Sequence, residues 1–78
     1  MTCREEIMIS VKQIIEAKGV NEFSIIEVIR HMNNNGTHFR ESTIRTHITS
    51  RLCKNAPDNH MVTYNDFERI EKGLYKLL

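Results

Sequence analysis

The stretch "RESTIRTHITSRLCKN", residues 40–55, combines a narrow apolar stripe with a surface of hydroxyls and arginines. Ile44, Ile48 and Leu52 recur at every fourth position, which predicts a helix over 42–53. Beyond its second residue the stretch contains no carboxylate. The side of this helix that faces away from the stripe is predicted to carry Ser42, Thr43, Thr46, Thr49, Ser50 and Cys53.

A face of short hydroxyls that is edged by arginine and lacks acid suits a polyanion. Hydroxyls bond to phosphate oxygens or to base edges, and arginine binds guanine O6 and N7 bidentately. On the helical wheel Arg45 flanks one edge of this face and Arg51 lies close to the apolar side. The alternative is that the hydroxyls cover a solvated surface and the arginines pair with glutamates elsewhere in the chain.

Two helices are predicted before this stretch, over 2–18 and 25–34. Each begins with a capping-box pattern, Thr2 with Glu5 and Ser24 with Glu27. Gly19 is suited to end the first helix, and the run "NNNG" (33–36) is suited to end the second. The segment between them contains Phe23 and is long enough only for a short strand. Phe39, in the connector 37–40, is predicted to fill the core rather than to stack on a base.

The chain changes character after the third predicted helix. "NAPDNH" has the only proline and predicts a loop over 54–63, which is followed by a hairpin over 64–78 with a tight turn at "EKG" (71–73). A helical turn is the alternative for the first strand, because Phe67 and Ile70 are three positions apart. The apolar contacts of the hairpin to the helices are assigned to Phe67, Ile70, Tyr75 and Leu77.

This order of elements predicts one α+β domain over 1–78, a small winged helix-turn-helix with three helices and a C-terminal β-hairpin wing. The motifs "STIRTHITSRLC", "NAPDNH" and "YNDFERIEKGLYKL" resemble the winged helix-turn-helix DNA-binding domains associated with restriction endonucleases and mobile-element proteins of bacteria and archaea. The resemblance extends from about Phe23 onward. Its closing pattern, F-x-R-x-x-x-G-x-Y-x-L, consists of Phe67, Arg69, Gly73, Tyr75 and Leu77.

The resemblance implies binding of double-stranded DNA through 42–53 and the wing. The domain would then be a transcriptional regulator or the targeting module of a restriction-type system, with any nuclease chemistry in another domain or a partner protein. The alternative is a protein–protein interaction module, with Met8 or Met61 in an exposed apolar patch. The candidate DNA-binding residues are Arg40, Ser42, Thr43, Arg45, Thr46, Thr49, Ser50, Lys54, Asn55 and Lys72.

Charge is distributed unevenly although the net charge is only +1. Residues 1–36 have four basic and five acidic side chains, residues 37–60 have four basic and two acidic, and residues 61–78 have three of each. The only basic excess therefore surrounds the hydroxyl-rich stretch. Because non-specific affinity for DNA scales with the number of phosphates neutralised, strong non-specific binding is not expected.

Catalytic, metal and membrane functions find little support in the sequence. Asp58 with His60, or His47 with Cys53, would make a dyad without a third group to orient it, so no enzyme activity is expected. Neither Cys3 nor Cys53 belongs to a pattern with metal-ligand spacing, and no metal or cofactor is expected. No apolar run approaches the ~18 residues of a membrane span, and a cytoplasmic location is expected.

Overall fold

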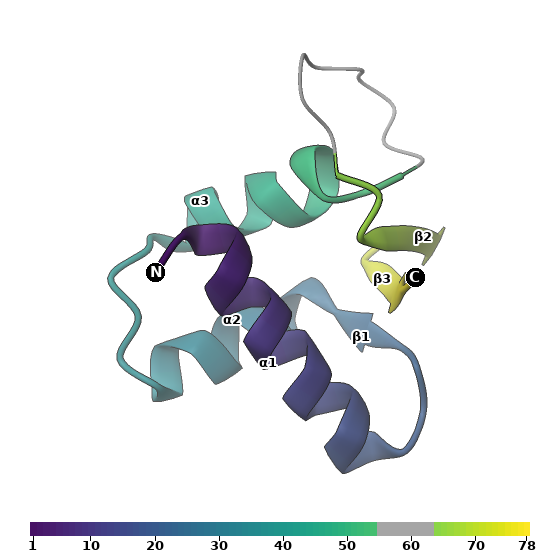
Figure 1. Ribbon diagram of the computed structural model, residues 1–78, viewed down its shortest axis with the longest axis horizontal. Helices are drawn as coiled ribbons and strands as arrows, with labels where there is room; N and C mark the ends of the chain where they lie inside the picture. Colours follow the sequence, from purple (N-terminus) through teal and green to yellow (C-terminus); the bar gives the residue numbers. More distant parts are fainter. Residues whose placement is uncertain (55–63) are drawn as a thin grey trace.

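A computed structural model describes residues 1–54 and 64–78 of the chain (Figure 1). In this part of the chain three helical segments and a three-stranded antiparallel sheet form the layout of a small winged helix-turn-helix, which confirms the α+β fold class. The spatial order of the strands is β1-β3-β2, so the first short strand pairs with the last strand of the C-terminal hairpin.

The first helix, α1 (Cys3–Lys18), has the limits that its sequence predicts. The Thr2 side chain accepts from the Glu5 N–H, and the Glu5 carboxylate accepts from the Thr2 N–H, so both halves of the capping box are formed. Gly19 ends the helix with a positive φ of 73°, a conformation that glycine adopts without strain.

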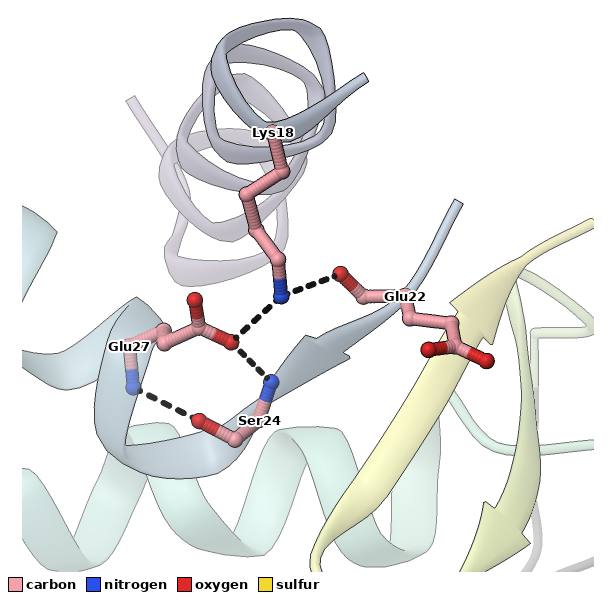
Figure 2. A network of polar contacts seen from close by, with 4 residues as sticks. All are labelled: Lys18, Glu22, Ser24 and Glu27. Atoms are coloured by element: carbon pink, nitrogen blue, oxygen red, sulfur yellow. Dashed lines mark hydrogen bonds and ion pairs between the residues drawn. The ribbon is translucent and has the colours of Figure 1, made fainter. Parts of the chain in front are cut away.

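A polar network joins the end of α1 to β1 (Phe23–Ser24) and α2 (Ile25–Asn34), as Figure 2 shows. The second predicted capping box is also formed, with the Ser24 N–H donating to Glu27 Oε1 at 2.8 Å. The Lys18 ammonium donates to the Glu22 carbonyl at 3.0 Å and to the same Glu27 oxygen at 3.1 Å. The N-terminal end of α2 is therefore fixed both by its own cap and by α1.

The third helical segment differs from its prediction at the C-terminal end. α3 (Glu41–Thr46) is a regular α-helix, but η1 (His47–Arg51) is a π-helical turn in which the Leu52 N–H bonds to the His47 carbonyl at 2.9 Å. Cys53 is already outside the helix, where it forms a parallel bridge with Phe67. The predicted position of Cys53 on the polar side is wrong, because this bridge turns the residue into the core, where it is only 1% exposed.

The C-terminal hairpin consists of β2 (Phe67–Glu71) and β3 (Leu74–Leu77) and is shorter than the predicted 64–78. A two-residue turn at 72–73 joins the strands, with Gly73 at φ 78°, so the first segment is a strand and not a helical turn. Ile70 lies at a register shift and is 44% exposed, so its predicted core contact is wrong. Of the predicted loop 54–63, residues 55–63 lie outside the described residues.

The core lies where the helices meet the sheet. The Phe23 ring packs edge-on against Phe67 at 4.9 Å between ring centroids and stacks on Tyr75 at 6.0 Å. The apolar stripe of α3–η1 is fully buried, with Ile44, Ile48 and Leu52 each 0% exposed. Phe39 is partly buried and packs against this cluster, which confirms its prediction as a core residue.

Candidate nucleic-acid interface

The N-terminal end of α3 is exposed and charged. Arg40 occupies the N-cap position, where the helix receives no side-chain capping bond. One turn further, Arg45 donates to the Glu41 carboxylate at 3.2 Å, with both side chains largely in solvent. An exposed pair of this kind contributes little to stability, so Arg45 can exchange its glutamate for another anion at small cost.

A shallow surface depression of about 300 Å³ follows the polar side of α3 into η1. Ser42 and Thr46 are exposed in it and Thr43 is half-buried. We call it the α3 depression; its lining residues are Ser42, Thr43, Thr46, His47 and Arg51. None of the five is acidic, so three of the predicted hydroxyls share one surface with two basic side chains.

His47 and Arg51 are the lining residues that the sequence did not assign to the interface. The His47 Nδ1 lies 2.9 Å from the Thr43 carbonyl; a carbonyl only accepts, so Nδ1 holds a hydrogen and donates to it. Arg51 lies near the apolar side on the helical wheel, and in the structure it is exposed. The sequence does contain a signal for them, because two basic residues four positions apart lie on the same side of a helix.

The other two predicted hydroxyls, Thr49 and Ser50, are only half exposed. The Thr49 hydroxyl donates to the Arg45 carbonyl at 2.9 Å, so it is partly used inside the helix. The predicted polar side is therefore open along α3 and partly covered along η1.

The remaining predicted cations lie outside the α3 depression. Lys54 is exposed and pairs with Glu68 at 3.7 Å, while Lys76 approaches the same carboxylate at 3.1 Å. The hydrogen bond from Lys76 and the charges of both lysines lower the pKa of Glu68 below its ordinary value. Lys72 is exposed at the hairpin turn, and Asn55 lies outside the described residues.

Of the residues considered for catalysis or metal binding, those that the structure describes are not gathered into a site. Cys53 is buried, so a pairing of His47 with Cys53 would have no accessible thiol, and Asp58 and His60 lie outside the described residues. Burial, aided by the nearby charge of Glu6, raises the pKa of the Cys3 thiol.

Residues 1–54 and 64–78 contain no group of three or more potential metal ligands, and no helix there is long and apolar enough to span a membrane.

Comparison with curated proteins and with solved structures gives no significant match. One family model matches residues 7–77, which extends from the second turn of α1 to the last residue of β3 and so includes every element of the fold. The chain therefore belongs to the family described as Domain of unknown function (DUF7669).

Proposed function

We propose that this domain binds double-stranded DNA, with α3–η1 in the major groove and the β2–β3 hairpin against the backbone. The observation that carries the proposal is the α3 depression, an acid-free surface of hydroxyls with His47 and Arg51 at one end. Short side chains such as Ser42 and Thr46 let the helix approach the base edges closely, and their hydroxyls can donate or accept there.

The cations around the depression supply contacts of two kinds. Arg45 projects from α3 itself and suits bidentate contact with guanine. Lys72 at the hairpin turn and Arg40 before α3 suit phosphate contacts, which position the protein without selecting a sequence. Because the chain has a net charge of only +1, specific contacts contribute more to binding here than bulk electrostatic attraction.

The biological setting that fits this proposal is transcriptional regulation or the targeting of a restriction-type system. Neither requires catalysis by this chain. In a restriction-type system, another domain or a partner protein would hydrolyse the DNA, and the winged helix would recognise the DNA site.

The test begins with selection of bound fragments from a random duplex pool, followed by titration of the selected duplex at several salt concentrations. Thr46→Glu places a carboxylate in the α3 depression, whereas Gln13→Glu places the same charge on an exposed position of α1. We expect Thr46→Glu to lower affinity at least tenfold and Gln13→Glu to lower it much less. Equal losses would contradict the proposed surface.

The alternative function, protein–protein interaction without DNA, names two residues, of which the structure describes only Met8. Met8 is only partly exposed and packs against the core, contrary to its predicted place in an exposed patch, and Met61 lies outside the described residues. Self-association that is insensitive to salt, together with no enrichment of any duplex, would nevertheless favour this alternative over DNA binding.

A further inference from the structure

We propose that a cleft beside the α3 depression holds one unpaired nucleotide of the bound DNA. The cleft has a volume of about 480 Å³ and lies between the first turn of α1 (2–5), His47 and Arg51 of η1, and Tyr64. His47 and Arg51 also line the α3 depression, so the two hollows adjoin at these side chains. The inference rests on the proposed function, because the cleft would receive its nucleotide from DNA held on α3.

Tyr64 supplies an aromatic surface whose position is fixed. Its backbone N–H donates to the Arg51 carbonyl at 2.7 Å, which fastens the residue to the end of η1. The Arg4 guanidinium lies 4.0 Å from the centre of the ring, and is itself held by Asp66 through bonds of 2.8 and 3.0 Å. The residue is nevertheless 44% exposed, so part of it stays in contact with solvent beside the Arg4 contact.

The polar groups of the cleft fit the two parts of a nucleotide. Arg51 is exposed and makes no ion pair within residues 1–54 and 64–78, and an exposed guanidinium suits a phosphate. Glu5 lines the α1 side, where its carboxylate accepts from the Thr2 N–H at 2.9 Å and repels a phosphate. This charge distribution directs the phosphate toward η1 and leaves the base beside the Tyr64 ring.

Stacking on an aromatic side chain is available to every base, because each base has a π-face. A paired base inside the duplex cannot reach Tyr64, whereas an unpaired one can leave the helix at little cost. The cleft volume lies within the range typical of small-molecule sites. A single aromatic platform therefore predicts a preference of roughly tenfold for a duplex with an unpaired nucleotide.

The experiment compares a fully paired duplex with a series in which one unpaired 2-aminopurine is stepped along the same site. We expect one position in the series to bind the protein roughly tenfold more tightly than the paired duplex, with quenching of the 2-aminopurine fluorescence by stacking. Tyr64→Phe keeps the ring and should keep both effects. Tyr64→Leu should abolish both effects and leave affinity for the paired duplex unchanged.

Equal affinity of the wild type for all duplexes would overturn the cleft proposal while leaving the proposed function intact. Binding of no duplex at all would overturn the proposed function. The cleft then retains a separate test, in which deoxyadenosine monophosphate is titrated and the amide chemical shifts are followed. Shifts confined to the surroundings of Tyr64, His47 and Arg51 would support the cleft, and unchanged shifts there would overturn it.

Discussion

The consecutive helices α2 and α3–η1 are both amphipathic, but they are stabilised in different ways. α2 begins with a complete capping box and is fastened to α1 through Lys18. α3 has no side-chain cap, consists largely of residues with modest helix propensity, and ends in a π-helical turn. α2 therefore has local hydrogen bonds that fix its start in addition to its buried residues, whereas α3–η1, without a side-chain cap, depends on its core contacts.

This difference separates structural from functional demands. The inner side of α3–η1 carries two fully buried side chains, Ile44 and Ile48, and the buried Leu52 follows directly after η1. These side chains hold the segment in place. Its outer side contributes little to stability: the Arg45–Glu41 pair is exposed, and Ser42 and Thr46 face solvent. The residues of such a surface can therefore change to suit a binding partner while the fold keeps its stability.

The largest effect is expected from Ile48→Ala. This residue is fully buried in η1, and removing its side chain should cost about 2–5 kcal/mol. A core of this size supplies only ~3–5 kcal/mol of net stability, so the variant should be largely unfolded in urea titrations followed by circular dichroism. Ile26→Ala, at a half-exposed position of α2, should change the free energy of unfolding much less. Similar losses for both would show that α3–η1 does not depend on the core as argued.

The next largest effect concerns binding rather than stability. Arg45→Ala should weaken binding to the selected duplex by ~1–3 kcal/mol and relax specificity at one base pair. Its free energy of unfolding should change by less than about 0.5 kcal/mol, because the pair with Glu41 is exposed. Lys12→Ala removes the same charge from an exposed position of α1 and serves as the control in fluorescence anisotropy. A uniform loss across all sequences would assign Arg45 to phosphate contact instead.

The sequence was sufficient where the decisive contacts are local. The limits of α1 and the start of α2 follow from Thr2, Gly19 and Ser24, each of which bonds to a residue at most four positions away. The hairpin turn follows equally from Gly73, which takes the positive φ that the turn requires. Short-range hydrogen bonding of this kind leaves a pattern that can be recognised in one sequence.

The sequence was insufficient where the decisive contacts are distant. The end of η1 depends on Phe67, whose N–H donates to the Leu52 carbonyl at 2.9 Å and whose carbonyl accepts from the Lys54 N–H at 2.8 Å. A helical wheel assumes a constant turn angle and cannot include this pairing, so it places Cys53 on the wrong side. The exposure of Ile70 has a similar origin, since a bulge is set by strand pairing.

A matched pair of serines sharpens the comparison between the two helices. Ser24→Ala removes the cap of α2 and should lower the free energy of unfolding by about 1 kcal/mol. Ser42→Ala, in the first turn of the uncapped α3, should change it by less than about 0.5 kcal/mol. The effects on DNA affinity, measured by fluorescence anisotropy, should have the opposite order. Ser42→Ala should weaken DNA binding, and Ser24→Ala should leave the affinity of the folded protein unchanged. Equal stability losses would mean that Ser42 has a capping role.

The smallest expected effect is a pH dependence of stability that arises from Glu27 at the start of α2. Burial tends to raise the pKa of Glu27, but the hydrogen bond from the Ser24 N–H and the nearby Lys18 ammonium outweigh it, so the pKa lies below its ordinary value. The ionised form is thus favoured by folding. Its contribution is complete above the unfolded pKa of about 4.3 and is lost as the pH falls through the folded value.

Glu27→Gln should therefore differ most from the wild type near pH 7, and the difference should shrink as the pH falls below ~4. The effect should be modest, because the Glu27 side chain is 37% exposed and solvent screens its pair with Lys18. Urea titrations at pH 7, 5 and 3 measure it, with Glu16→Gln at an exposed position of α1 as the control. A difference that stays constant with pH would mean that the network in Figure 2 is held by hydrogen bonds that the amide reproduces, and that the charge of Glu27 contributes little to the start of α2.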